Sequence, residues 1–73
     1  MLKKDMKVIR EMVIEERECG HIFCDFDDRQ HDLIEIADAI GAEMYQDEDD
    51  DWVIADKDKK RVEECLEYYY DLH

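Results

Sequence analysis

Apolar positions near the start of the chain fit two kinds of element. Over residues 1–19 they recur at spacings of four, three and four, which is typical of an amphipathic helix. Over residues 6–14 they also nearly alternate with polar positions, as in a strand. Early lysines and late glutamates would oppose a helix dipole, and the β-branched pairs Val8-Ile9 and Val13-Ile14 favour a strand. We therefore predict a strand; the alternative is a helix with the buried stripe Leu2, Met6, Ile9 and Val13.

The next segment contains a predicted strand followed by a predicted helix. Gly20 ends the first element, and residues 21–26 are predicted to form a strand with Ile22, Cys24 and Phe26 on one face. Asp27 or Asp28 is expected to cap the helix that follows, and Gly41 to end it. The apolar stripe of this helix consists of Leu33, Ile36, Ala37 and Ile40.

A run of five acids separates two short strand-like segments in the second half of the chain. Residues 43–46 and 52–55 flank the run Asp47-Glu48-Asp49-Asp50-Asp51, which predicts a β-hairpin with the acids at its tip. Asp56 or Asp58 is then expected to cap a last helix. Its stripe consists of Val62, Cys65, Leu66 and Tyr69.

The order of these elements predicts a small α+β fold. The stripes of the two later helices lie 29 positions apart, which suggests two β-β-α units in tandem. We therefore expect a two-layer domain of topology ββαββα, with an antiparallel sheet of three to four strands and two helices on one face. If the first element is a helix, the topology becomes αβαββα. At 73 residues the chain is expected to form a single domain, 1–73.

Net charge narrows the choice of partner. The chain has 23 acidic and 10 basic residues, a formal net charge of −13. A nucleic-acid-binding protein needs a basic face to neutralise phosphates, so direct nucleic-acid binding is not expected. An anionic membrane would also repel this chain. The expected partners are a basic protein surface or metal cations.

Cysteine usage and the N-terminal segment indicate a compartment. The three cysteines, Cys19, Cys24 and Cys65, are an odd number, which suggests free thiols in a reducing environment. The first residues lack the apolar core of a secretion signal, and no apolar run is long enough to span a membrane. We therefore expect a cytoplasmic protein.

Two groups of acids are candidate partner-binding residues. A rigid array of carboxylates can occupy the basic nucleic-acid site of another protein, with fast, salt-sensitive association. In composition and size the chain resembles DNA-mimic inhibitors made by phages and mobile elements, which implies such a site on a nucleic-acid-binding protein as the target. Aromatic residues among the acids suit an interface. The candidate residues are Asp47, Glu48, Asp49, Asp50, Asp51 and Trp52, with a second patch at Asp25, Asp27, Asp28 and Asp32.

A cation-binding loop is the rival hypothesis. Asp47, Asp49 and Asp51 have the first three ligand spacings of an EF-hand, and this stretch resembles that calcium loop. The resemblance departs at Trp52, where the EF-hand needs glycine, and at Asp58, where it needs a bidentate glutamate. A third alternative is a structural subunit of a larger complex. The sequence leaves the oligomeric state open.

Enzymatic activity is not expected from this composition. The chain contains no serine or threonine, which excludes a serine or threonine nucleophile. Each cysteine is next to acidic residues, which disfavour the thiolate form. Two glycines, Gly20 and Gly41, cannot form a glycine-rich phosphate loop. We expect no cofactor and no catalytic residues.

Overall fold

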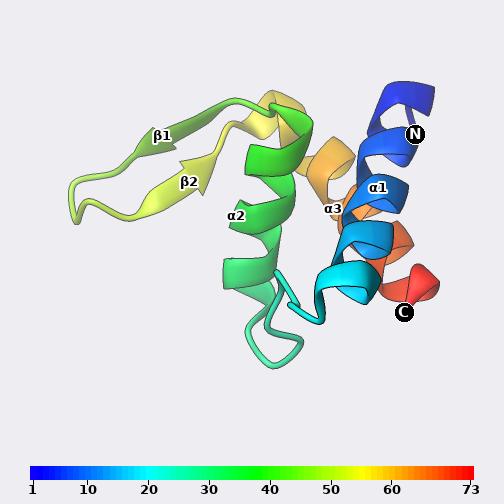
Figure 1. The fold of residues 1–73 in the computed structure, drawn as a ribbon. Helices are drawn as coiled ribbons and strands as arrows, with labels where there is room; N and C mark the ends of the chain where they lie inside the picture. The colour runs from blue at the N-terminus through cyan, green and yellow to red at the C-terminus, as the bar shows by residue number, and fades with distance from the viewer.

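The computed structural model describes all 73 residues and contains three helices and one hairpin (Figure 1). The helices are α1 (Lys3–Cys19), α2 (Arg29–Ile40) and α3 (Asp56–Leu72), and the strands are β1 (Met44–Gln46) and β2 (Trp52–Ile54). The three helices pack on one another, α2 lies between α1 and the hairpin, and the hairpin projects away from the helical body (Figure 1). The prediction of a sheet with three to four strands was wrong, since the sheet has two.

The first element is a helix, so the predicted strand over this segment was wrong; of the alternative stripe, Leu2 is 51% exposed and Met6 is partly buried. Ile9 and Val13 of the predicted stripe are buried, and each contributes about 1.5–3 kcal/mol when fully buried. Opposed helix-dipole charges cost about 0.3–1 kcal/mol each, so packing outweighs them. Gly20, in the left-handed region at φ 68°, donates its N–H to the carbonyl of Glu16 and ends the helix.

Residues 21–26 do not form a strand, so the strand predicted for this segment was wrong. With α1 helical, no neighbouring strand remains to pair with this segment, and an unpaired strand leaves its backbone groups unsatisfied. Cys24 is buried, whereas Ile22 and Phe26 are about half exposed, at 58% and 46%. Phe26 stacks against Tyr69 with a ring-centroid distance of 6.0 Å. The segment is thus a connector held by side chains.

The second helix follows its prediction closely. The carboxylate of Asp28 accepts a hydrogen bond from the His31 N–H at 3.1 Å and caps the N-terminus. Gly41 ends the helix in the left-handed region at φ 72°. Ile36, Ala37 and Ile40 are buried, and Leu33 packs against the core at partial exposure.

The hairpin also forms as predicted, but its place in the fold differs. Met44 pairs with Ile54, Tyr45 with Val53 and Gln46 with Trp52 in an antiparallel register. Strand β2 contacts α2, and no pair of helices covers one face of the sheet. The observed order is α-α-β-β-α, so both ββαββα and αβαββα were wrong, and the tandem β-β-α repeat is absent.

The last helix confirms its stripe and corrects its cap. Val62, Cys65, Leu66 and Tyr69 are all fully buried. Ala55 occupies the N-cap position without a side-chain hydrogen bond, so neither Asp56 nor Asp58 is the cap. The Asp58 carboxylate instead accepts a hydrogen bond from the backbone N–H of Glu43 at 2.9 Å. None of the three helices combines the length and the apolar character needed to cross a membrane.

Candidate partner-binding surface

Backbone hydrogen bonds and one aspartate define the hairpin tip, residues Asp47–Asp51. The Asp47 Oδ1 atom accepts hydrogen bonds from the N–H groups of Asp49 at 2.9 Å and Asp51 at 3.1 Å. The Asp50 N–H donates to the carbonyl of Asp47 at 3.1 Å, closing a tight turn. Asp50 lies in the left-handed region at φ 62°, where aspartate is tolerated better than most residues. The side chain of Asp47 therefore organises the loop, and the other four acidic residues of the tip are exposed.

The five tip acids lack cationic neighbours. All are exposed, and none takes part in any of the ion pairs of the molecule. The first basic residue before the tip is Arg29 and the first one after it is Lys57, and these pair with Glu67 at 3.0 Å and Glu43 at 3.2 Å. Because no counter-charge is built in, the negative field of the tip extends into solvent.

Charge is partitioned between two parts of the chain. Residues 18–56, here called the acidic part, contain fourteen acidic residues and one arginine, a net charge of −13. Residues 1–17 and 57–73, the balanced part, contain nine of each sign and are neutral overall. The acidic part forms α2, the connectors and the hairpin, and the balanced part forms most of α1 and α3 (Figure 1). The whole net charge therefore lies on α2, the hairpin and the connectors of a molecule measuring 38 × 24 × 16 Å.

The second predicted patch is divided by the fold. Asp25, Asp27 and Asp28 are exposed around the start of α2. Asp32 is fully buried, where its carboxylate accepts hydrogen bonds from the Asp25 N–H at 2.6 Å and from the hydroxyl of Tyr70. Buried Asp32 thus holds the connector backbone by a hydrogen bond, and the surface patch consists of the other three aspartates.

A groove between α2 and the hairpin, here called the tip groove, contains residues of the first predicted patch and one residue, Asp28, of the second. It has a volume of about 550 Å³ and brings Asp28 beside Asp47, Asp51 and Trp52. Ile34 and Val53 supply the remaining apolar surface, and Gln30 and His31 complete the lining. Asp28 is distant in sequence from the tip, and only the packing of β2 on α2 brings them together.

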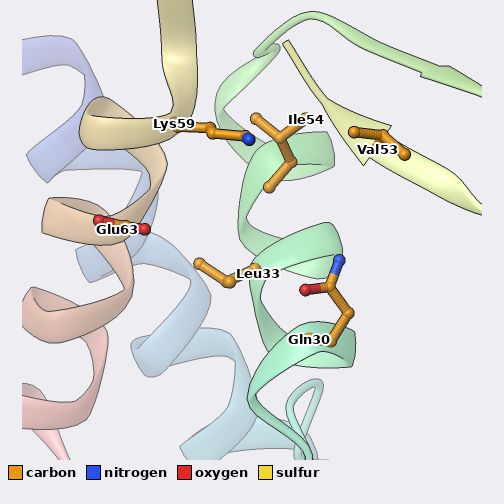
Figure 2. A pocket seen from close by; sticks show the side chains of 6 residues that line it. All are labelled: Gln30, Leu33, Val53, Ile54, Lys59 and Glu63. Atoms are coloured by element: carbon orange, nitrogen blue, oxygen red, sulfur yellow. The ribbon is translucent and has the colours of Figure 1, made fainter. Parts of the chain in front are cut away.

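A neighbouring cavity of about 320 Å³ lies between α2, β2 and α3 (Figure 2). Its lining comes from three elements: Gln30 and Leu33 on α2, Val53 and Ile54 on β2, and Lys59 and Glu63 on α3 (Figure 2). Lys59 lines this cavity and forms an ion pair with Asp56 at 3.1 Å, so the cavity contains a cationic side chain. The tip groove contains no lysine or arginine, which sets the two spaces apart electrostatically.

The tip is also the one place where carboxylates converge closely enough to hold a metal ion. One carboxylate oxygen from each of Asp47, Asp49 and Asp51 lies within 4.8 Å of the others. Three carboxylate oxygens suit a hard cation such as calcium. Strands rather than helices flank the loop, so the structure does not reproduce the helix–loop–helix of an EF-hand.

The remaining titratable groups of note are buried and structural. Arg61 donates to the two carboxylate oxygens of Asp5 at 2.8 and 2.9 Å, which lowers the pKa of this buried aspartate. Burial raises the pKa of Cys24 and of Cys65 to about 11 each, so neither thiol is ionised near neutral pH. These groups stabilise the core and offer no nucleophile at the surface.

Sequence reasoning missed the apolar side of the tip groove. Ile34 and Val53 were assigned no role, although Ile34 falls outside the stripe of α2 that packs into the core. The position of Ile34 outside the predicted stripe could therefore have indicated a second apolar surface on this helix. Comparison with protein families, curated proteins and solved structures found no match to this chain.

Proposed function

We propose that this protein is a non-enzymatic acidic binding module whose α2–hairpin side docks on the basic face of a partner protein. In its most specific form the partner is a nucleic-acid-binding protein, and the module occupies its nucleic-acid site as a DNA-mimic inhibitor does. The single observation that carries the proposal is the charge partition, which puts the entire net charge of −13 on residues 18–56.

The physical basis is long-range attraction without an internal counter-charge. The five acids at the tip form no ion pairs and stand on a hairpin that projects from the helical body (Figure 1). Such a field steers a basic partner into contact and raises the association rate by about 10–10³-fold at low ionic strength. The balanced part contributes little to this field, so the molecule presents one face to its partner.

The experiment compares two matched triple variants in capture from cell lysate at low ionic strength. One neutralises Asp49→Asn, Asp50→Asn and Asp51→Asn at the tip; asparagine tolerates the left-handed conformation of residue 50. The control neutralises Glu11→Gln, Glu15→Gln and Asp71→Asn, which are exposed, unpaired acids of the balanced part. Once a basic partner is purified, we expect the tip variant to associate about tenfold more slowly and the control to behave like the natural protein.

Competition with duplex DNA tests the inhibitor form of the proposal. If the module occupies a nucleic-acid site, DNA displaces it from the captured partner and the module blocks DNA binding in return. A partner that holds the module and DNA together contradicts the inhibitor form. Equal slowing by the two triple variants contradicts the docking side.

Calcium binding at the tip is the second candidate function, and the convergence of Asp47, Asp49 and Asp51 within 4.8 Å favours it. Titration with calcium, followed by amide NMR shifts, separates the two functions. Saturating shifts confined to the tip, lost in the tip variant but not in the control, would establish a cation site. Small shifts that spread over all exposed acids and are reproduced by sodium chloride would count against it.

A further inference from the structure

The tip groove has an unusual combination of an open aromatic surface and unpaired carboxylates. Trp52 is 50% exposed, and no other aromatic ring lies against it. Ile34 and Val53 extend this apolar surface across the groove. Asp28, Asp47 and Asp51 line the same groove, and none of the three forms an ion pair. An indole surrounded by anions is a favourable environment for a cation.

The free carboxylate oxygens of the groove allow this cation to be bound by hydrogen bonds. Asp28 uses Oδ1 to cap α2, and Asp47 uses Oδ1 to hold the tip loop. The Oδ2 atoms of both residues and the carboxylate of Asp51 accept no hydrogen bond from the protein. The folding roles of Asp28 and Asp47 also fix these side chains in place, so a ligand need not order them.

We propose that the tip groove binds an arginine side chain of a basic protein partner, with its guanidinium on the Trp52 indole and its N–H groups donating to the surrounding carboxylates. This inference rests on the proposed function and names the residue type that its docking side recognises. A guanidinium is planar and weakly hydrated, stacks on aromatic rings and donates in pairs to carboxylates. A lysine ammonium is a strongly hydrated point charge and uses the indole face less well.

Trp52 is the only tryptophan of the chain, so its fluorescence reports on the groove directly. The experiment titrates the full-length protein with a short arginine–glycine peptide and with its lysine–glycine counterpart, at neutral pH and low ionic strength. We expect the arginine peptide to change the Trp52 emission and to bind about threefold to fivefold more tightly than the lysine peptide. The same titration followed by amide NMR shifts locates the contact independently of fluorescence.

Two single-charge variants show whether the groove or the overall field is responsible. Asp28→Asn removes one groove carboxylate but keeps a good N-cap for α2. Glu11→Gln removes an exposed, unpaired charge from α1, in the balanced part. We expect the arginine peptide to lose about fivefold in affinity with Asp28→Asn and less than about twofold with Glu11→Gln.

The outcomes separate the two proposals. If both peptides bind equally, without a change in Trp52 emission and with equal losses in the two variants, the groove inference is overturned while the acidic docking side stands. If neither peptide binds at low ionic strength, the groove inference and the proposed function fail together. If arginine is preferred and the loss is specific to Asp28→Asn, the groove inference is supported.

Discussion

In the balanced part nine acidic residues stand against nine basic ones, whereas the acidic part holds fourteen against one arginine. The two parts also differ in whether their acidic residues form ion pairs. Arg61 of α3 binds Asp5 of α1 and the carbonyl of Ile40 at the end of α2, joining three helices. At the hairpin tip, by contrast, no acid contacts a base. Ion pairing therefore joins helices in the balanced part, whereas the carboxylates of the tip have no counter-charge.

The largest effect should come from breaking this assembly pair. In Arg61→Met the carboxylate of Asp5, 1% exposed, loses its counter-ion and two hydrogen bonds. Because an uncompensated buried charge is costly, we expect the free energy of unfolding to fall by about 3 kcal/mol, measured by urea denaturation near neutral pH. The matched tip variant Asp49→Asn, which removes a charge without a partner, should not destabilise the fold.

The double variant Asp5→Leu with Arg61→Met is the control for the same experiment. Replacing both partners by apolar residues removes the buried charge itself, so most of the lost stability should return. A single Arg61→Met variant that loses less than about 1 kcal/mol would show that the two parts do not differ as we state.

Alkaline pH should give the next largest effect, and it acts through the buried groups. Burial raises the pKa of Cys24 and Cys65 from 9.0 to about 11 and also raises the pKa of Tyr69. In the unfolded chain these groups lose their protons at lower pH than in the folded protein. Rising pH therefore stabilises the unfolded state relative to the folded state. The stabilisation by these groups is therefore fully present below about pH 9 and is lost as pH rises through 11; at pH 10 we expect a loss of about 1 kcal/mol for each thiol.

Urea denaturation at a series of pH values measures this decline, and thiol reactivity checks its cause. Cys19 is exposed, so it should react with a thiol reagent in the native protein, whereas Cys24 and Cys65 should react only on unfolding. Stability that stays constant up to pH 11 would contradict the assignment of the two buried thiols as neutral core groups.

The sequence predicted those elements whose signals are local. The stripes of α2 and α3, the cap at Asp27 or Asp28 and the hairpin with the acids at its tip all depend on residues close in sequence, and they agree with the structure. Residues 1–26 were assigned wrongly because their secondary structure depends on contacts with residues distant in sequence. Ile9 and Val13 become helical by packing in the shared core, and Arg61 stabilises the same helix from 56 positions away.

The candidate site shows the same limit. The acidic tip and Trp52 were predicted as one group because they are adjacent in sequence. Their meeting with Asp28 and Ile34 depends on how β2 lies on α2, which no local pattern encodes. Asp32 was predicted as part of a surface patch, but it is buried, and its carboxylate accepts hydrogen bonds from the Asp25 N–H and the Tyr70 hydroxyl.

The smallest effect should come from the backbone of the tip, where residue 50 has a positive φ of 62°. Asp50→Gly and Asp50→Ala remove the same unpaired charge, but only glycine adopts this conformation without strain. Glycine should therefore be more stable than alanine by about 1 kcal/mol in urea denaturation, although neither residue packs against anything. Asp50→Asn should lie between them, because asparagine tolerates the left-handed region better than alanine. If alanine matches glycine, the tip does not hold its turn in solution, and an array of carboxylates fixed by Asp47 would lose its structural basis.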